Sequence, residues 1–383
     1  MLLDETGRLT AAPALENGVH TLTVCNACRY CEQYCPVFPA MEERTSFARA
    51  DLTYLANLCH NCGECLYACQ YAPPHEFGIN VPRTLAEIRL VSYQDYAWPR
   101  RLAVVFRTHS MISAAGLVVA FSGWMLLAAR LTGSRVQTAV SGGDFYRIIP
   151  HGAMVAIFGS VFAFVVIAIG IGVARFLRDA SGRPDLSAVA LAKAEDRQPR
   201  TSGAAWRALR DAVTLRHLHT TGADCVSDEE ERRPWRRWSH HIVLWGFLLC
   251  FASTSVAAVY HSVFGWVAPY AYTSVPVVLG SLGGVALLAG CAGLWTLRGR
   301  RDAALGDPAQ DGLDRSFMTL LFVTSVTGLA LLVLRESAVM GRLLAIHLGS
   351  VLALFVTLPY GKFVHGLYRL AALWVYERSR PRT

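Results

Sequence analysis

Residues 25–36 read CNACRYCEQYCP, and residues 59–70 read CHNCGECLYACQ. Each run has four cysteines separated by two, two and three residues, which is the bacterial ferredoxin spacing for cubane iron–sulfur clusters. Three thiolates of one tight loop hold three irons of a cube, and the fourth usually comes from the last cysteine of the other run. The spacing therefore predicts two 4Fe-4S clusters. Their ligand sets are Cys25, Cys28, Cys31 and Cys69 for cluster 1, and Cys59, Cys62, Cys65 and Cys35 for cluster 2.

Zinc and disulfides explain these cysteines less well. Structural zinc sites use paired CxxC knuckles, whereas this chain has two four-cysteine runs with spacings of two, two and three residues. A disulfide framework needs an oxidising compartment, and residues 1–20 lack the charged start and apolar core of a secretory signal. One departure from small two-cluster ferredoxins is that Gln70 follows Cys69, where a proline follows Cys35. Residues 36–58 show helix-like spacing without alternation, which favours a mostly helical ferredoxin over a βαβ-type one.

The remainder of the chain has the composition of a membrane protein. Of 383 residues, 53% are hydrophobic and 17% are charged, which excludes a disordered or collagen-like chain and argues against a wholly soluble one. The uncharged stretch 238–297 must fold back on itself, because one span needs about 20 residues. We place the turn at Val267–Tyr270. The sequence thus predicts six transmembrane helices, at 103–129, 149–174, 240–262, 273–297, 316–334 and 343–366.

Basic residues outside the spans set the expected orientation. The connections 175–237 and 298–315 and the tail after Gly361 carry 13, four and five Lys or Arg residues, whereas the alternate connections carry three, none and two. Positive loops stay in the cytoplasm, so we expect an inner (cytoplasmic) membrane protein with both termini cytoplasmic. The net charge of +8 follows from this topology and does not indicate nucleic-acid binding.

These features divide the chain into four parts within an all-α fold. Residues 1–97 form a cytoplasmic ferredoxin-like domain, and residues 98–177 form the first two transmembrane helices. Residues 178–237 form a cytoplasmic linker, in which 206–219 has the pattern of an amphipathic helix on the membrane surface. Residues 238–383 form the last four transmembrane helices and carry the candidate haem-binding histidines.

Histidines within membrane spans are rare and point to function. His347 and His365 are 18 residues apart, which on one helix is five full turns and a rise of about 27 Å, so the sixth span would offer a histidine near each membrane surface. The third span runs antiparallel to it, begins at His240 and His241 and ends at His261. Since neutral imidazole binds haem iron, the pattern predicts bis-histidine haem b sites. One would use His365 with His240 or His241, and the other His347 with His261.

Other positions leave alternatives open. The helical facing relative to His261 favours His240 over His241, but the sequence does not decide between them. Pro359 lies between the two histidines of the sixth span, where a proline bends or breaks a helix. His109 and His151, each alone in its span, are either interfacial groups or part of a quinone pocket. We expect the remaining histidines not to bind iron: His60 and His75 beside the clusters, and His20, His217 and His219 facing solvent.

Two long stretches carry a resemblance to a known family. Residues 240–261 (HHIVLWGFLLCFASTSVAAVYH) and 345–366 (AIHLGSVLALFVTLPYGKFVHG), together with the cysteine runs, resemble the tricarballylate-utilisation protein B family, also called the citrate-utilisation B family. The resemblance covers almost the whole chain. It implies an electron-transfer protein that takes electrons from a soluble FAD-dependent dehydrogenase acting on tricarballylate or a similar small carboxylate. The electrons would pass through the clusters and haem b to membrane quinone.

The membrane half is similar in kind to the gamma subunit of respiratory nitrate reductase, which carries the same histidine separation on its last long helix. The closely spaced pair on that subunit's other haem-bearing helix is not reproduced, so the haem count stays at one or two. The sequence has no Gly-rich dinucleotide fingerprint, which is why the flavin must belong to a partner. Two alternatives remain: an electron-transfer subunit for another flavoprotein or a disulfide reductase, and an iron–sulfur redox sensor.

Overall fold

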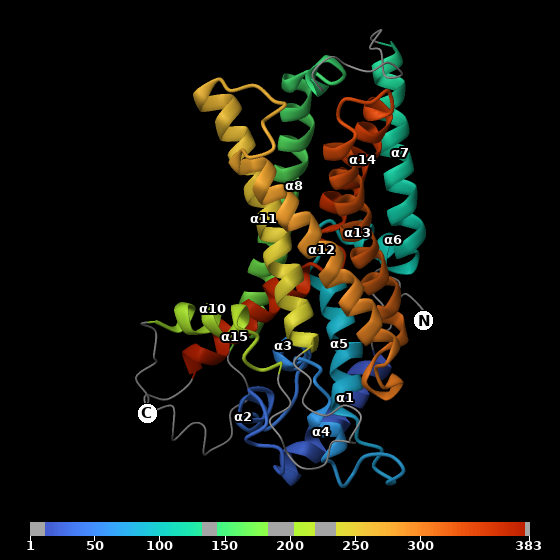
Figure 1. Ribbon diagram of the computed structural model, residues 1–383. Helices are drawn as coiled ribbons and strands as arrows, with labels where there is room; N and C mark the ends of the chain where they lie inside the picture. The colour runs from blue at the N-terminus through green and yellow to red at the C-terminus, as the bar shows by residue number, and fades with distance from the viewer. Residues whose placement is uncertain (1–11, 132–143, 183–202, 219–234, 380–383) are drawn as a thin grey trace.

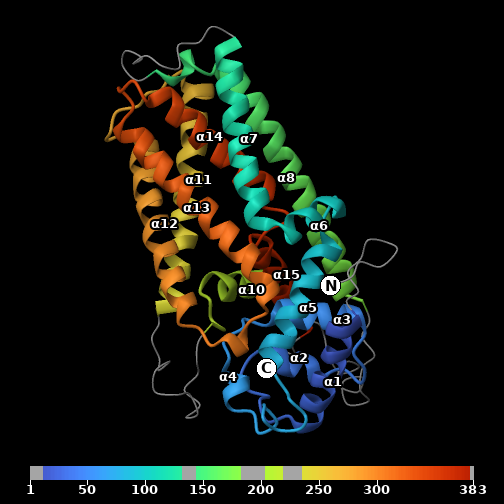
Figure 2. The same ribbon diagram turned by 90° about the vertical axis from the view of Figure 1, so that its right-hand side faces the viewer.

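The computed structural model describes residues 12–131, 144–182, 203–218 and 235–379, and its regular elements within these ranges are all helical. A bundle of long helices stands on a smaller head built from the N-terminal helices (Figure 1). Helix α5 leads from the head toward the bundle, where α6 and α7 follow it (Figure 2). The expected all-α fold, a ferredoxin-like domain followed by six apolar helices, is confirmed.

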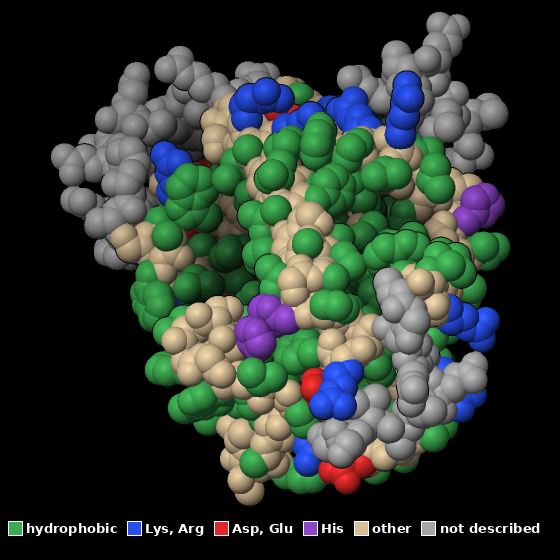
Figure 3. Space-filling view, turned by 90° about the horizontal axis from the view of Figure 1, so that it is seen from above, with side chains coloured by type: hydrophobic (Ala, Val, Ile, Leu, Met, Phe, Trp, Pro, Cys, Tyr) green, Lys and Arg blue, Asp and Glu red, His purple; other side chains and the backbone are tan. Residues whose placement is uncertain are grey.

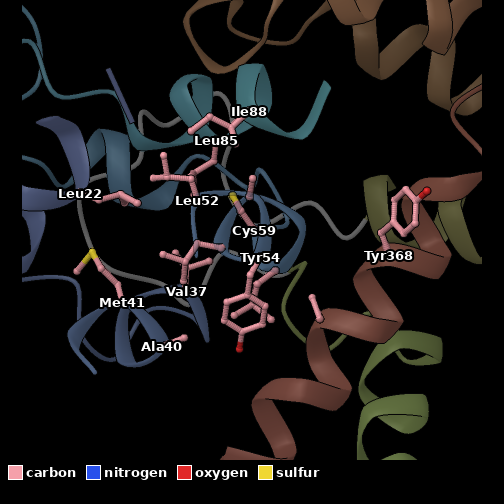
Figure 4. Close-up of a cluster of buried hydrophobic side chains, with 14 of the residues drawn as sticks. Leu22, Val37, Ala40, Met41, Leu52, Tyr54, Cys59, Leu85, Ile88 and Tyr368 are labelled. Carbon is pink, nitrogen blue, oxygen red and sulfur yellow. The ribbon is translucent and has the colours of Figure 1, made fainter. Parts of the chain in front are cut away.

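The head packs five helices around one core. They are α1 (Ala12–Cys28), α2 (Val37–Glu42), α3 (Arg49–Leu58), α4 (Glu64–Tyr67) and α5 (Val81–Tyr96). Leu52 of α3 lies against Leu85 and Ile88 of α5 with almost no exposed surface, and Cys59 lies beside them (Figure 4). Burial of these side chains fixes the end of α3, and thereby the start of the second cysteine run, against α5.

Six helices are long and apolar enough to cross a membrane. They are α7 (Ser110–Leu131), α8 (His151–Ala180), α11 (Trp235–Phe264), α12 (Val275–Gly299), α13 (Asp311–Val333) and α14 (Met340–Thr357). They overlap the six predicted spans in order, and the predicted turn at Val267–Tyr270 lies between α11 and α12. A separate short helix, α6 (Arg100–Thr108), takes up the start of the first predicted span.

The prediction of one continuous helix at 343–366 is wrong. Helix α14 ends at Thr357, and the backbone N–H groups of Tyr360 and Gly361 both donate to its carbonyl, at 3.1 and 2.8 Å. Pro359 has no N–H with which to continue the helical pattern, so the chain turns here. A new helix, α15 (Val364–Ser379), then begins.

This turn separates the two histidines of the predicted sixth span. His347 lies in α14, and His365 lies in α15, which runs obliquely across the head end of the bundle beside α10 (Ala204–Val213) (Figure 1). The separation of five helical turns therefore does not hold. His365 is instead placed by α15 between the bundle and the head.

Small residues bring α11 and α12 together along their length. A Cβ on Gly283 would lie 2.8 Å from the backbone nitrogen of Cys250 and from the carbonyl oxygen of Gly246. On the neighbouring face, a Cβ on Gly284 would meet Leu329 of α13 at 3.1 Å. Such close approach of backbones is how helices associate in an apolar environment. Helix α11 therefore packs mainly on α12.

Helix α10 lies within the predicted linker and overlaps the amphipathic helix predicted at 206–219, but it ends at Val213. Its Ala204 and Ala208 are buried, whereas Trp206 is 68% exposed. Arg207 bonds Glu377 of α15 at 2.7 Å, which attaches α10 to that helix. Residues 183–202 and 219–234 of the linker, which include His219, lie outside the described residues.

Candidate iron–sulfur and haem sites

Each cysteine run lies where a head helix ends: Cys25 and Cys28 are in the last turns of α1, and Cys65 is in the short helix α4. Helix α1 ends at Cys28, and α3 ends one residue before Cys59. Arg29 and Asn61 have φ angles of 54° and 55°, and Gly63 has a φ of 98°. These left-handed residues turn the chain sharply within each run, which a helix would not allow.

The first set of thiols gathers around one pocket of the head. The pocket is lined by all four predicted ligands of cluster 1, Cys25, Cys28, Cys31 and Cys69, and also by Cys65. Burial, followed by the nearby thiols of Cys69, Cys31 and Cys28, raises the pKa of Cys25 to about 12. Burial and the thiols of Cys69 and Cys28 likewise raise the pKa of Cys31 to about 12. The structure thus brings Cys69 of the second run to the three thiols of the first.

The second set of thiols takes one cysteine from the first run. Burial, followed by the thiols of Cys62 and Cys59, raises the pKa of Cys35 well above its ordinary value. Burial and the thiols of Cys62, Cys59 and Cys35 do the same for Cys65. The backbone N–H of Asn61 points at the sulfur of Cys59 at 3.3 Å, a contact of the kind that tunes a cluster. Cys35 of the first run therefore joins Cys59, Cys62 and Cys65.

The two sets fit cubane clusters. Thiols with raised pKa values are protonated near neutrality, so only binding of a strongly charged metal group converts them to the thiolates that serve as ligands. In the described part of the chain, no group of three or more His, Cys, Asp or Glu residues is arranged to hold a single metal ion.

His240 and His365 lie close together at the head end of the bundle. Nδ1 of His365 lies 2.5 Å from the carbonyl oxygen of Lys362, so its N–H donates there and Nε2 is left to bind a ligand. Burial, followed by the charges of Arg369 and Lys362, holds the pKa of His365 well below its ordinary value, and His240 is near enough to contribute. The imidazole is therefore neutral, which is the form that ligates haem iron.

The structure separates His240 from His241. Arg369, Lys362 and Asp314 surround His240, whereas His241 lies near the backbone of Thr214, which follows α10. Only His240 faces the same side as His365. Phe247, about two helical turns beyond His240 on α11, packs on Phe363, two residues before His365, with ring centroids 5.7 Å apart.

The outer pair expected from the sequence, His261 with His347, is not brought together. Nδ1 of His347 lies 3.1 Å from Oγ1 of Thr327, and its ring packs on Gly328 of α13. His261 instead stacks on His151 of α8, with ring centroids 3.6 Å apart. The predicted topology already put the start of α8 and the end of α11 at the same membrane surface, which was the signal for this contact. Figure 3 views this end of the bundle, where histidines lie among hydrophobic side chains.

The other histidines mostly lie where they were expected, with one exception. His20 is exposed, and His75 packs on Tyr71 and Phe77 near the first set of thiols. His60 is buried, with Nδ1 3.0 Å from the carbonyl oxygen of Leu58. His217 is not solvent-facing as predicted: its ring packs edge-to-face on His60 and its Nε2 lies 3.6 Å from Asp211.

Comparison with known proteins identifies the family. Residues 18–95 match the model of the "Citrate utilization protein B Fer4-like domain", and residues 103–383 match that of "Citrate utilization protein B". The chain belongs to the citrate utilization protein B family. A curated Citrate utilization protein B from Escherichia coli is 47% identical over 364 residues, which cover 94% of this chain and 92% of the relative. No solved structure matches the chain significantly. The seven residues between the two matches, 96–102, run from the end of α5 into the start of α6, where the structure passes from head to bundle.

Proposed function

We propose that the protein transfers electrons from a soluble FAD-dependent dehydrogenase, through two 4Fe-4S clusters and haem b, to membrane quinone. The observation that carries this proposal is the succession of candidate redox sites. Two crossed sets of four thiols lie in the head, and the His240–His365 pair lies between the head and the apolar helices. The family supports small-carboxylate metabolism, so the dehydrogenase would oxidise tricarballylate or a similar small carboxylate.

In this proposal, each residue has a defined part. The two sets of cysteines would hold the clusters, and His240 and His365 would hold the iron of haem b. When bound, these groups supply the one-electron steps that side chains cannot carry out. The Lys362 carbonyl fixes the ring orientation of His365, and such a contact also raises the basicity of the ligating nitrogen. Phe247 and Phe363 limit the access of water to the pair.

The chain also holds the second cluster loop and the histidine pair at a fixed separation. Arg89 of α5 and Arg369 of α15 each donate a hydrogen bond to the carbonyl oxygen of Cys59, at 2.8 and 2.9 Å. Arg369 is one helical turn from His365 on α15. The contact therefore ties a cluster 2 ligand to the helix that carries a haem ligand.

The orientation that we propose puts the head in the cytoplasm, with the protein in the inner membrane. The loops that carry most of the basic residues all connect helices at the head end. A cytoplasmic head is accessible to a soluble dehydrogenase and lies where thiols stay reduced.

The test is reconstitution of the full chain in proteoliposomes with a quinone, the purified dehydrogenase and tricarballylate. We expect quinol to form only when both proteins are present, and we expect Cys69→Ala and Cys35→Ala to abolish it. Oxidation of tricarballylate by the chain alone would contradict the need for a partner. Failure of the complete mixture to reduce quinone, with clusters and haem bound, would contradict the proposed route.

A further inference from the structure

Basic side chains from separate elements converge between the cluster 2 loop and the histidine pair. Arg89 and Arg369 meet at one carbonyl, that of Cys59. Nζ of Lys362 lies 2.8 Å from Asp314, and the backbone carbonyl of the same lysine holds Nδ1 of His365. We call Arg89, Arg301, Arg369 and Lys362 the cationic group.

Arg301, in the loop after α12, belongs to this group because it lies among the same charges. Its Nη2 donates to the carbonyl of Leu305 at 3.2 Å. Burial, followed by the charge of Arg236, lowers the pKa of Arg301 to about 10. Burial and the charge of Arg89 do the same for Arg369. Positive charge is therefore crowded in a region with little water.

Negative charge within the described residues does not balance it. The carboxylate of Asp314 serves both Lys362 and Arg298. Arg89, Arg301 and Arg369 form no ion pair with any described residue, and the Nε atoms of Arg301 and Arg369 are buried without a hydrogen-bond partner. A buried charge without a partner is costly, so this region is suited to receive an anion.

We infer that the cationic group binds the two propionate carboxylates of the haem b that His240 and His365 would hold. This inference rests on the haem site of the proposed function. Lys362 links the cationic group to the haem site, because its carbonyl orients the ligand His365 while its ammonium belongs to the cationic group. Guanidinium groups match carboxylates with two parallel hydrogen bonds, which the buried Nε atoms are free to complete.

The thiolates of cluster 2 are the competing source of negative charge. They account for Arg89 and Arg369, which hold the Cys59 carbonyl. They do not account for Arg301 and Lys362, whose side chains form no hydrogen bond with either cysteine run. A phospholipid headgroup is a second competitor, because its phosphate offers the same anionic oxygens.

The experiment compares two probes on the full-length, cluster-loaded protein prepared without haem. Iron protoporphyrin IX has two free propionates, and its dimethyl ester has none. We expect wild-type protein to bind the ester at least about tenfold more weakly, as expected for lost charged hydrogen bonds. Arg301→Gln should weaken binding of the free acid and leave binding of the ester unchanged.

Arg300→Gln is the matched control, because Arg300 is the exposed neighbour of Arg301 and forms no ion pair in the described chain. It should preserve the preference for the free acid. Equal binding of acid and ester by wild-type protein would overturn the inference and leave the haem site intact. If neither probe binds, the haem site of the proposed function fails with it.

Two further readouts separate the competing anions. If cluster 2 alone uses the cationic group, Arg301→Gln will shift the midpoint potential of cluster 2 and leave the discrimination between acid and ester unchanged. If a lipid phosphate occupies the cationic group, anionic lipid added to the detergent will compete with both probes for the wild-type protein. It will compete with neither probe for the Arg301→Gln variant. Either result would contradict propionate binding.

Discussion

Nη2 of Arg369 donates a 2.9 Å hydrogen bond to the carbonyl oxygen of Cys59, although 310 residues separate the two in the chain. The bond joins α15 at the base of the bundle to the loop of the second cysteine run in the head. Arg89 donates to the same oxygen from within the head. This one carbonyl group thus links the cluster 2 loop both to α5 and to the helix that carries His365.

Removing this contact should loosen cluster 2 more than cluster 1. We expect Arg369→Met to destabilise the docked head by about 1.5–3 kcal/mol, the usual contribution of a hydrogen bond to a charged group. Loss of visible cluster absorbance on heating would measure it. The control is Arg378→Met on the same helix, whose guanidinium lies over Trp374 at the surface. Equal stability of the two variants would contradict the role of the bond.

The crossed ligand sets predict which cluster each cysteine controls. Cys69→Ala should remove cluster 1 and leave cluster 2, whereas Cys35→Ala should do the reverse. Iron and sulfide analysis, with electron paramagnetic resonance of the reduced protein, would count and identify the clusters that remain. Cys250→Ala, in α11, should keep both. If Cys35→Ala removed the cluster that depends on Cys25, the exchange of ligands between the runs would be wrong.

The raised thiol pKa values predict a pH dependence for the protein without clusters. Cys25 and Cys31 have pKa values of about 12 in the folded chain against an ordinary 9.0. Their protonation stabilises the fold fully below about pH 9, and that stability is lost as the pH rises toward 12. Thermal unfolding should therefore show the cluster-free protein weakening above pH 9. The cluster-loaded protein has no such protons to lose, and a matching decline in it would refute this explanation.

The close approach of α11 and α12 predicts a steric effect. A valine at Gly283 would press on the backbone of Gly246 and Cys250, so Gly283→Val should destabilise the protein by about 1–3 kcal/mol. Gly123→Val is the control, because nothing lies within 4 Å of a Cβ at Gly123. The melting temperature in detergent should fall for the first variant only. Similar values for both would mean that the two helices can separate without cost.

The sequence predicted best what depends on local spacing. Four cysteines within eleven residues must lie close together in space, and long uncharged stretches must form apolar helices whatever surrounds them. The amphipathic helix at α10 was visible for the same reason, since its pattern repeats every turn. The exchange of Cys35 and Cys69 between the two ligand sets was expected from the spacing alone, because the last cysteine of each such run usually completes the cluster of the other run.

The sequence did not predict what depends on the path of the chain between elements. Pro359 was visible, but whether a proline bends or ends a helix depends on the partners of the freed carbonyls. His365 therefore lies on α15 instead of α14, and its 18-residue separation from His347 does not correspond to five turns of one helix. The cationic group draws on residues from 89 to 369, and no local pattern marks such a set. His151 was considered alone because its stacking partner, His261, lies on another helix.

The most direct test of electron transfer through haem is a reduced-minus-oxidised visible spectrum of the detergent-purified chain, with a pyridine haemochrome count. We predict a b-type spectrum that is lost in His240→Ala and His365→Ala and kept in His241→Ala. A protein that contains iron and sulfide but no haem would contradict the assignment. Electrons would then have to pass from cluster to quinone directly, or the head would serve as a sensor.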